Sequence, residues 1–172
     1  MDGAFVVFDR DGTLIHHVHH LSQPNQTLIF PDVTTSLKRI ALAGFGIGLI
    51  SNQSVIGRKI ASEDTVRSIN RKIEDELALE GIHFKFMLIC PHIPEDNCEC
   101  RKPRPGMSRI AQSKFGLIPK SSFMVGDQPS DMEFARNSGM TPIGIRNREV
   151  LNGNVEYYFD NLEDFADWLV ED

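Results

Sequence analysis

Short apolar runs alternate with longer stretches of helical period along the chain. The apolar runs have the length and composition of buried strands, and we predict six, at residues 4–8, 47–51, 86–89, 122–126, 142–145 and 157–159. Between and after them, apolar positions recur at helical spacing in residues 34–43, 62–80, 105–115, 129–138 and 162–170. This alternation is typical of a parallel sheet with helices on both faces.

Composition agrees with one globular unit. The chain has 172 residues, of which 41% are hydrophobic and 24% charged, enough to bury one core. Repeats, low-complexity tracts and interdomain linkers are not evident. We therefore predict one domain over residues 1–172, with an α/β fold of three layers, Rossmann-like, around a central and mostly parallel sheet.

The charge balance excludes some partners. A net charge of −6 argues against a large nucleic-acid footprint, which needs clustered Lys and Arg. The N-terminus lacks the basic and apolar pattern of a secretory signal, and no apolar window reaches the length of a membrane span. We expect a cytoplasmic protein that binds neither nucleic acid nor membranes, while the sequence leaves the oligomeric state open.

Polar clusters directly follow the predicted strands. The stretch FDRDGTL places Asp9 and Asp11 after the first strand, Ser51 closes the second, Lys102 follows the third, and Asp127 follows the fourth. In open parallel sheets, ligands bind beyond the carboxyl ends of the strands. These side chains should therefore converge at one edge of the sheet.

Phosphoryl transfer uses this set of groups. Asp9 can attack phosphorus as a nucleophile, and Asp11 can protonate the leaving oxygen and later deprotonate water. Two carboxylates would repel a phosphate without a cation, and Mg²⁺ prefers oxygen ligands. We predict a Mg²⁺ site made by Asp9, Asp11 and Asp127 with a backbone carbonyl of the loop.

The same edge supplies groups for the phosphate oxygens. Lys102 offers a positive charge to the nucleophile and the phosphoryl group. Ser51 and the backbone N–H groups around Asn52 and Gly12 can donate hydrogen bonds to those oxygens. Each residue also has a simpler interpretation, as a turn, a helix cap or surface charge.

Four segments in order, FDRDGT, LISNQS, RKPRPGM and VGDQPSD, resemble the four motifs of the haloacid dehalogenase (HAD) superfamily of phosphatases. The resemblance spans most of the chain. It implies a HAD-like fold, an aspartyl-phosphate formed on Asp9, acid/base catalysis by Asp11, phosphate binding by Ser51 and a supporting role for Asp131 behind the metal. The motif spacing leaves no room for a large cap domain.

A second cluster lies in CPHIPEDNCECRK. Three thiols and an imidazole, from Cys90, His92, Cys98 and Cys100, suit tetrahedral Zn²⁺ with no open position. We predict a structural zinc that fixes the following residues, Arg101 and Lys102. Three buried free thiols are the alternative, which the interleaved histidine and polar neighbours disfavour.

The zinc pattern resembles one branch of the superfamily, the D-glycero-D-manno-heptose 1,7-bisphosphate phosphatases and the histidinol-phosphate phosphatases. RKPRPGM, the length of the segment at residues 13–33 and Gly57-Arg58 are more similar to the heptose enzymes. That likeness implies removal of the C7 phosphate, in a pathway to lipopolysaccharide or surface-layer heptose. Arg58 and Arg101 would then bind the retained phosphate or sugar hydroxyls.

Other functions remain open at this stage. A binding protein without catalytic activity, stabilised by zinc, would be expected to lack Asp9, Asp11 or Lys102, and all three are present. A polynucleotide end phosphatase would need a basic groove with aromatic side chains, which the net negative charge of the chain disfavours. The HHVHH run, in which a metal site is the weaker interpretation, is expected to form a solvated or substrate-facing flap, with His16, His17, His19 and His20.

Overall fold

The computed structural model describes residues 3–153 and 155–171 and contains a six-stranded sheet in the order β3-β2-β1-β4-β5-β6. Every pair of neighbouring strands is parallel. The strands are β1 (Phe5–Phe8), β2 (Gly46–Asn52), β3 (Phe86–Cys90), β4 (Phe123–Gly126), β5 (Thr141–Ile145) and β6 (Tyr157–Phe159). The helices are α1 (Val33–Leu42), α2 (Ser54–Gly57), α3 (Glu63–Ala78), α4 (Gly106–Phe115), α5 (Pro129–Ser138), α6 (Arg148–Leu151) and α7 (Leu162–Glu171).

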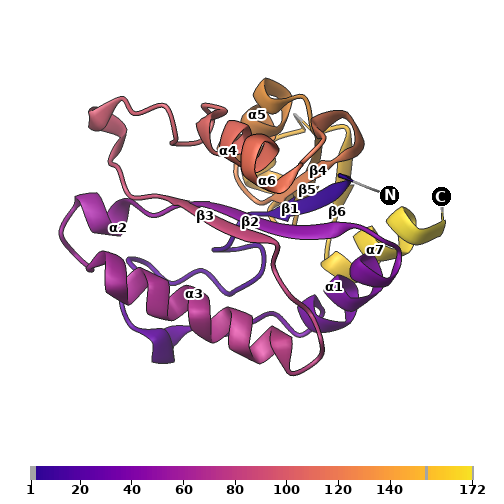
Figure 1. Cartoon of the computed structure of the whole chain (residues 1–172), viewed down its shortest axis with the longest axis horizontal. Coiled ribbons are helices and arrows are strands. Elements are labelled where there is room, and N and C mark those ends of the chain that lie inside the picture. The colour runs from indigo at the N-terminus through magenta and orange to yellow at the C-terminus, as the bar shows by residue number, and fades with distance from the viewer. Residues whose placement is uncertain (1–2, 154, 172) are drawn as a thin grey trace.

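Helices cover both faces of the sheet. Figure 1 shows α1, α3 and α7 on one side of it and α4, α5 and α6 on the other. Ile40 of α1, Ile73 of α3 and Phe165 of α7 belong to one apolar cluster, whereas Met107 of α4 and Phe134 of α5 belong to the other. The sheet is therefore buried on both faces, which explains why its central strands read as continuous apolar runs.

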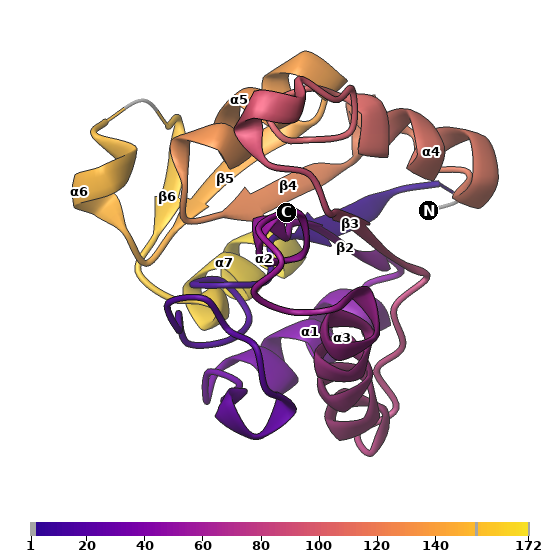
Figure 2. The ribbon, with the colours of Figure 1, turned by 90° about the vertical axis from the view of Figure 1, so that its left-hand side faces the viewer.

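The strand order reverses at β1, which pairs with β2 on one side and β4 on the other. The chain covers one face while it builds β2 and β3, and the other face while it builds β4 to β6; both views show this division (Figures 1 and 2). A crevice forms beyond the carboxyl ends of strands at such a reversal. The segments that follow β1, β2, β3 and β4 meet there.

The predicted α/β, three-layer architecture is confirmed, and each predicted strand end lies within one residue of the observed end. Helices α2 and α6 were missed because four residues are too few to show a helical period. Within residues 3–153 and 155–171 no large cap is present, and the β1–α1 connection contains a short 3-10 turn, Pro24–Gln26, and the isolated β-bridges Asp11–Ile15 and Ile15–Ile29.

The helices in this part of the chain are all too short or too polar to cross a bilayer.

Candidate active site

Lys102 lies at the centre of the crevice, almost fully buried. Its Nζ donates to Oδ1 of Asp9 at 2.7 Å, to Oδ1 of Asp131 at 2.6 Å and to the carbonyl of Ile50 at 2.9 Å. Burial lowers the pKa of Lys102, but the facing carboxylates of Asp131 and Asp9 outweigh it and raise the pKa above its ordinary value. The lysine therefore stays charged between two carboxylates.

Three carboxylates converge beside this ammonium. Oxygens of Asp9, Asp127 and Asp131 lie within 4.8 Å of one another, and all three residues are buried. Oδ1 of Asp127 has no hydrogen-bond partner among the described residues. Burial, together with the charge of Asp9, raises the pKa of Asp127 to about 6. Three anions facing one ammonium, with a free buried oxygen, fit a divalent cation of the Mg²⁺ type.

Gly12 makes room for this cluster. Its φ is +80°, a conformation that side chains rarely adopt, and a Cβ there would overlap the carboxylate of Asp127. The loop after β1 can therefore turn against the end of β4. That close approach brings Asp127 next to Asp9.

Asp11 lies beside the carboxylate cluster rather than within it. Nε and Nη2 of Arg10 donate to its two oxygens at 3.1 and 3.2 Å, and Nε2 of Gln53 donates to Oδ2 at 2.9 Å. Asp11 was predicted among the Mg²⁺ ligands; the group of carboxylate oxygens within 4.8 Å of one another comes from Asp9, Asp127 and Asp131, and the side chain of Asp11 lies outside it. Asp11 is held by a cation and an amide, while it lines the same cavity as Asp9.

Ser51 and Asn52 occupy the end of β2 but differ in what they contact. Oγ of Ser51 accepts from Nε2 of Gln53 at 2.8 Å, so the hydroxyl keeps its proton for another acceptor. The amide of Asn52 donates to the carbonyl of Lys102 at 3.1 Å and accepts from its N–H at 3.0 Å. Asn52 thus fixes the backbone that carries the lysine, and its side-chain amide is already engaged.

Two adjoining cavities open over these groups. The first, of about 290 Å³, is lined by Asp9, Asp11, His17, Ser51, Asn52, Arg101, Lys102, Gln128, Ser130 and Asp131. The second, of about 330 Å³, shares Asp11, His17 and Asn52 with it and adds Arg58, His19 and His20. The structure therefore places Arg101 in the first cavity and Arg58 in the second, while His17 lines both.

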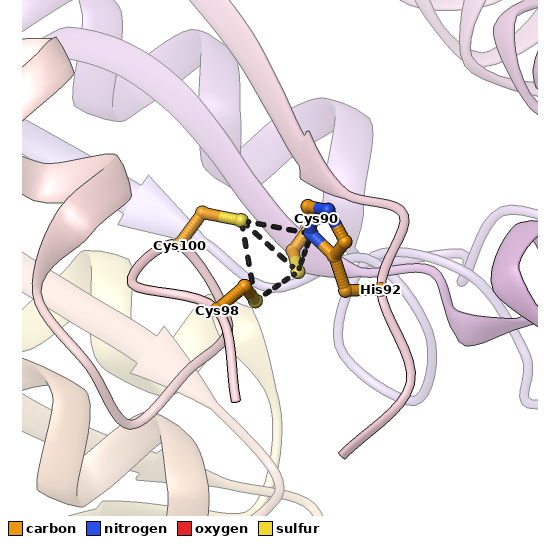
Figure 3. A group of neighbouring side chains, drawn as sticks. All are labelled: Cys90, His92, Cys98 and Cys100. Carbon is orange, nitrogen blue, oxygen red and sulfur yellow. Dashed lines mark hydrogen bonds between the residues drawn. The ribbon is translucent and has the colours of Figure 1, made fainter. Parts of the chain in front are cut away.

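The four predicted zinc ligands form a compact cluster (Figure 3). Sulfur–sulfur distances are 3.6 Å for Cys90–Cys98, 3.3 Å for Cys90–Cys100 and 3.5 Å for Cys98–Cys100. Nδ1 of His92 lies 3.6 Å from the sulfur of Cys90 and 3.2 Å from that of Cys100. Tetrahedral Zn²⁺ with bonds of about 2.3 Å would give edges of roughly 3.7 Å, so the donors fit this ion.

The cluster of predicted zinc ligands is joined directly to the crevice that holds Lys102. Nη1 of Arg101 donates to the carbonyl of His92 at 3.1 Å. A Cβ on Gly106 would overlap the carbonyl of Glu99, so the end of the loop packs closely against the start of α4. In the sequence, Lys102 lies between Arg101 and Gly106, which make these two contacts. The cluster can therefore set the position of the lysine.

Some residues of the site were not assigned a role from the sequence. Arg10, which lies between Asp9 and Asp11 in the sequence, is buried, and its partners are Asp11, Gln53 and Asn70. A charged residue at the exit of a buried strand must be paired, which was a usable signal. No comparable signal marked Asn70, because it lies on α3, 60 residues from Arg10.

Comparison with known proteins agrees with this geometry. Residues 99–164 match the HAD-hydrolase-like family model. A probable D-glycero-D-manno-heptose-1,7-bisphosphate 7-phosphatase of Thermoplasma volcanium is 36% identical over 129 residues, which cover 74% of this chain and 88% of that protein. The chain belongs to the HAD phosphatase family. The predicted family and enzyme class, a phosphoric monoester hydrolase, are thereby confirmed.

Other relatives of this HAD phosphatase carry both predicted names. D-glycero-beta-D-manno-heptose-1,7-bisphosphate 7-phosphatase of Rhodopseudomonas palustris is 32% identical, over 77% of each chain. The histidine biosynthesis bifunctional protein HisB of Legionella pneumophila is 34% identical over 80% of this chain but only 40% of its own length. The crystal structure of D,D-heptose 1,7-bisphosphate phosphatase from B. bronchiseptica, complexed with magnesium and phosphate, superimposes with a TM-score of 0.91 at 26% identity, over 98% of both chains.

Replacing Lys102 by methionine tests the buried network of this HAD phosphatase. The change leaves Asp9 and Asp131 without their cation, and breaking a buried pair in this way costs about 3–5 kcal/mol of unfolding free energy. Urea denaturation in Mg²⁺-free buffer would measure the loss. Lys38→Met, which removes an exposed pair with Glu80, is the control and should cost at most about 1 kcal/mol. Equal small losses in both variants would contradict the network.

Proposed function

We propose that this HAD phosphatase hydrolyses the C7 phosphate of D-glycero-D-manno-heptose 1,7-bisphosphate, as one phosphatase domain over the whole chain. The observation that carries the reaction type is the buried cluster of Asp9, Asp127 and Asp131 around Lys102, with a free oxygen on Asp127. The substrate is supported by the names of the most complete relatives and by the TM-score of 0.91 with a heptose bisphosphate phosphatase.

In the proposed reaction a carboxylate oxygen of Asp9 attacks phosphorus while the ester P–O bond breaks. Asp11, which lines the same cavity, gives its proton to the leaving alkoxide oxygen. Water then attacks the aspartyl-phosphate, and Asp11 takes a proton from that water. The bond between phosphorus and the Asp9 oxygen breaks, which releases inorganic phosphate and restores the Asp9 carboxylate. Asp11 now carries the proton that it needs for the next turnover.

The remaining groups hold the phosphate during both steps. Mg²⁺ bound by Asp9 and Asp127, with Asp131 behind them, would supply the charge that neutralises the phosphoryl oxygens. Lys102 orients Asp9 through its bond of 2.7 Å and adds positive charge. Ser51 can direct its free proton to a phosphoryl oxygen. Zn²⁺ in the four-ligand cluster would serve structure alone, because no coordination position remains open.

The two adjoining cavities suit a substrate with two phosphates. The reacting phosphate would lie near Asp9 and Lys102, and the sugar would extend past His17 toward Arg58. Arg101 and Arg58 then face the retained phosphate or the sugar hydroxyls. Because an arginine can bind a phosphate with two parallel hydrogen bonds, either residue is suited to this contact.

Phosphate release with Mg²⁺ tests the substrate. The value of kcat/KM is measured for both anomers of the heptose bisphosphate and for histidinol phosphate, on one enzyme preparation. We expect a preference of at least about a hundredfold for the heptose, which corresponds to about 2.7 kcal/mol in transition-state binding. Product analysis should find the phosphate at C1 retained.

Histidinol phosphate is the second candidate substrate, because HisB relatives match 80% of the chain. A preference for it would replace the heptose assignment and leave the reaction chemistry unchanged. Weak and equal rates on both compounds would reject both substrates.

A further inference from the structure

Arg10 is the largest side chain that the fold buries completely, with 1% of its surface exposed. It lies between Asp9 and Asp11 in the sequence, directly after β1. An unpaired guanidinium at this depth would be very costly, so its partners show what it does. Every partner is a polar side chain, and one of them is Asp11.

The guanidinium of Arg10 makes a bidentate contact with the carboxylate of Asp11. Nε and Nη2 donate to its two oxygens, so the carboxylate plane is matched to the guanidinium plane. Such a pair fixes orientation as well as position. Asp11 needs this help, because its side chain is 21% exposed and it lies on the loop after β1.

Two further contacts fix the guanidinium itself. Nη1 donates to Oδ1 of Asn70 at 2.9 Å, and Nη2 donates to Oε1 of Gln53 at 2.8 Å. Asn70 is buried on α3, whose neighbouring residues Ile69 and Ile73 pack into the core. A rigid helix on one face of the sheet is thus linked, through Arg10, to the side chain at the mouth of the crevice.

We propose that Arg10, held by Asn70, is a positioning residue that orients the carboxyl group of Asp11 for proton transfer to the leaving oxygen. The inference rests on the proposed function, since it takes Asp11 as the general acid. Helix α3 thereby contributes to catalysis although none of its side chains touches the phosphate site. The role of Asn70 is to keep the guanidinium from turning away from Asp11.

A general acid matters most when the leaving group is poor. The alkoxide of a sugar or of histidinol needs a proton as the P–O bond breaks, whereas p-nitrophenolate leaves without one. The value of kcat/KM reports only steps up to the first irreversible one, here transfer of the phosphoryl group to Asp9. A misplaced Asp11 should therefore lower kcat/KM for an alkyl phosphate far more than for p-nitrophenyl phosphate.

The experiment compares these two esters in three variants. The alkyl ester is whichever of the heptose bisphosphate and histidinol phosphate the wild type hydrolyses faster. Asp11→Asn defines the signature of a lost acid, which we expect to be a selective loss on the order of 10²-fold or more. Asn70→Leu, remote from the phosphate, and Arg10→Lys should each lose about tenfold or more on the alkyl ester and less than about threefold on the aryl ester.

Ile69→Val is the matched control on α3. It weakens the packing of the same helix without touching Arg10, so it should lower the melting temperature and leave the alkyl-to-aryl ratio unchanged. Equal losses on both esters in Asn70→Leu and Arg10→Lys, or no loss in either, would overturn the positioning role. If Arg10→Lys fails to fold, Asn70→Leu decides the question alone. A wild type that hydrolyses neither alkyl ester would instead refute the proposed function.

Discussion

Asp9→Asn should abolish phosphate release while the protein stays folded. The amide cannot form the acyl phosphate, and it also withdraws a charged oxygen from the carboxylate cluster. Removal of a nucleophile from a site whose members act together costs on the order of 10⁴-fold or more in kcat. Lys102 keeps Asp131 as a partner at 2.6 Å, so the fold retains its central ion pair. Steady-state phosphate release and a thermal melt would measure both effects.

Asp75→Asn provides the matched control for that change. Asp75 is exposed on α3, far in sequence from the crevice residues, so the same chemical substitution should leave turnover and melting temperature unchanged. Acid quenching during turnover should trap phosphate on wild-type protein and none on Asp9→Asn. Appreciable turnover by Asp9→Asn would contradict the assignment of Asp9 as the nucleophile.

The residues of the crevice were predictable because each follows a buried strand. Asp9, Ser51 and Asp127 had to appear at one edge once the strands were parallel and neighbouring, and the parallel pairing is what the structure shows. Lys102 was placed by its motif and lies among the same groups. For these residues, their place directly after a strand or within a motif was enough to predict where they lie in the fold.

Contacts between distant segments were not predictable in the same way. The pairing of Asn52 with the backbone of Lys102 joins residues that are 50 positions apart, and that of Arg10 with Asn70 joins residues 60 apart. In the sequence, an asparagine at a strand end resembles a turn residue, and one inside an amphipathic helix resembles an ordinary solvent-exposed side chain. Only the packing of α3 and the loop after β3 against the sheet gives these side chains their partners.

The cluster of predicted zinc ligands is linked to the phosphate site through the residues next to it in the chain. Cys100 is two residues from Lys102, His92 accepts a hydrogen bond from Arg101, and Asn52 holds Lys102 from the other side. In the proposed zinc site three thiols lie 3.3–3.6 Å from one another, and burial raises the pKa of the Cys90 thiol to about 12. Without Zn²⁺ the loop would lose its closure, and Lys102 would lose the support that the loop gives to its backbone.

We therefore expect His92→Asn to lose both zinc and activity. Structural zinc sites bind with about 10–16 kcal/mol in small domains, and most of that energy stabilises the fold. A displacement of Lys102 by about 1 Å would cost on the order of 10²-fold in kcat. Elemental analysis of protein purified without chelator should find about one Zn per wild-type chain and much less in the variant, with a lower melting temperature. His83→Asn, at an exposed histidine before β3, should match the wild type in all three measurements. Stable, active wild-type protein without zinc would contradict the structural role, because the crevice would then hold Lys102 in place through Asn52, Asp9, Asp131 and the carbonyl of Ile50 without the metal.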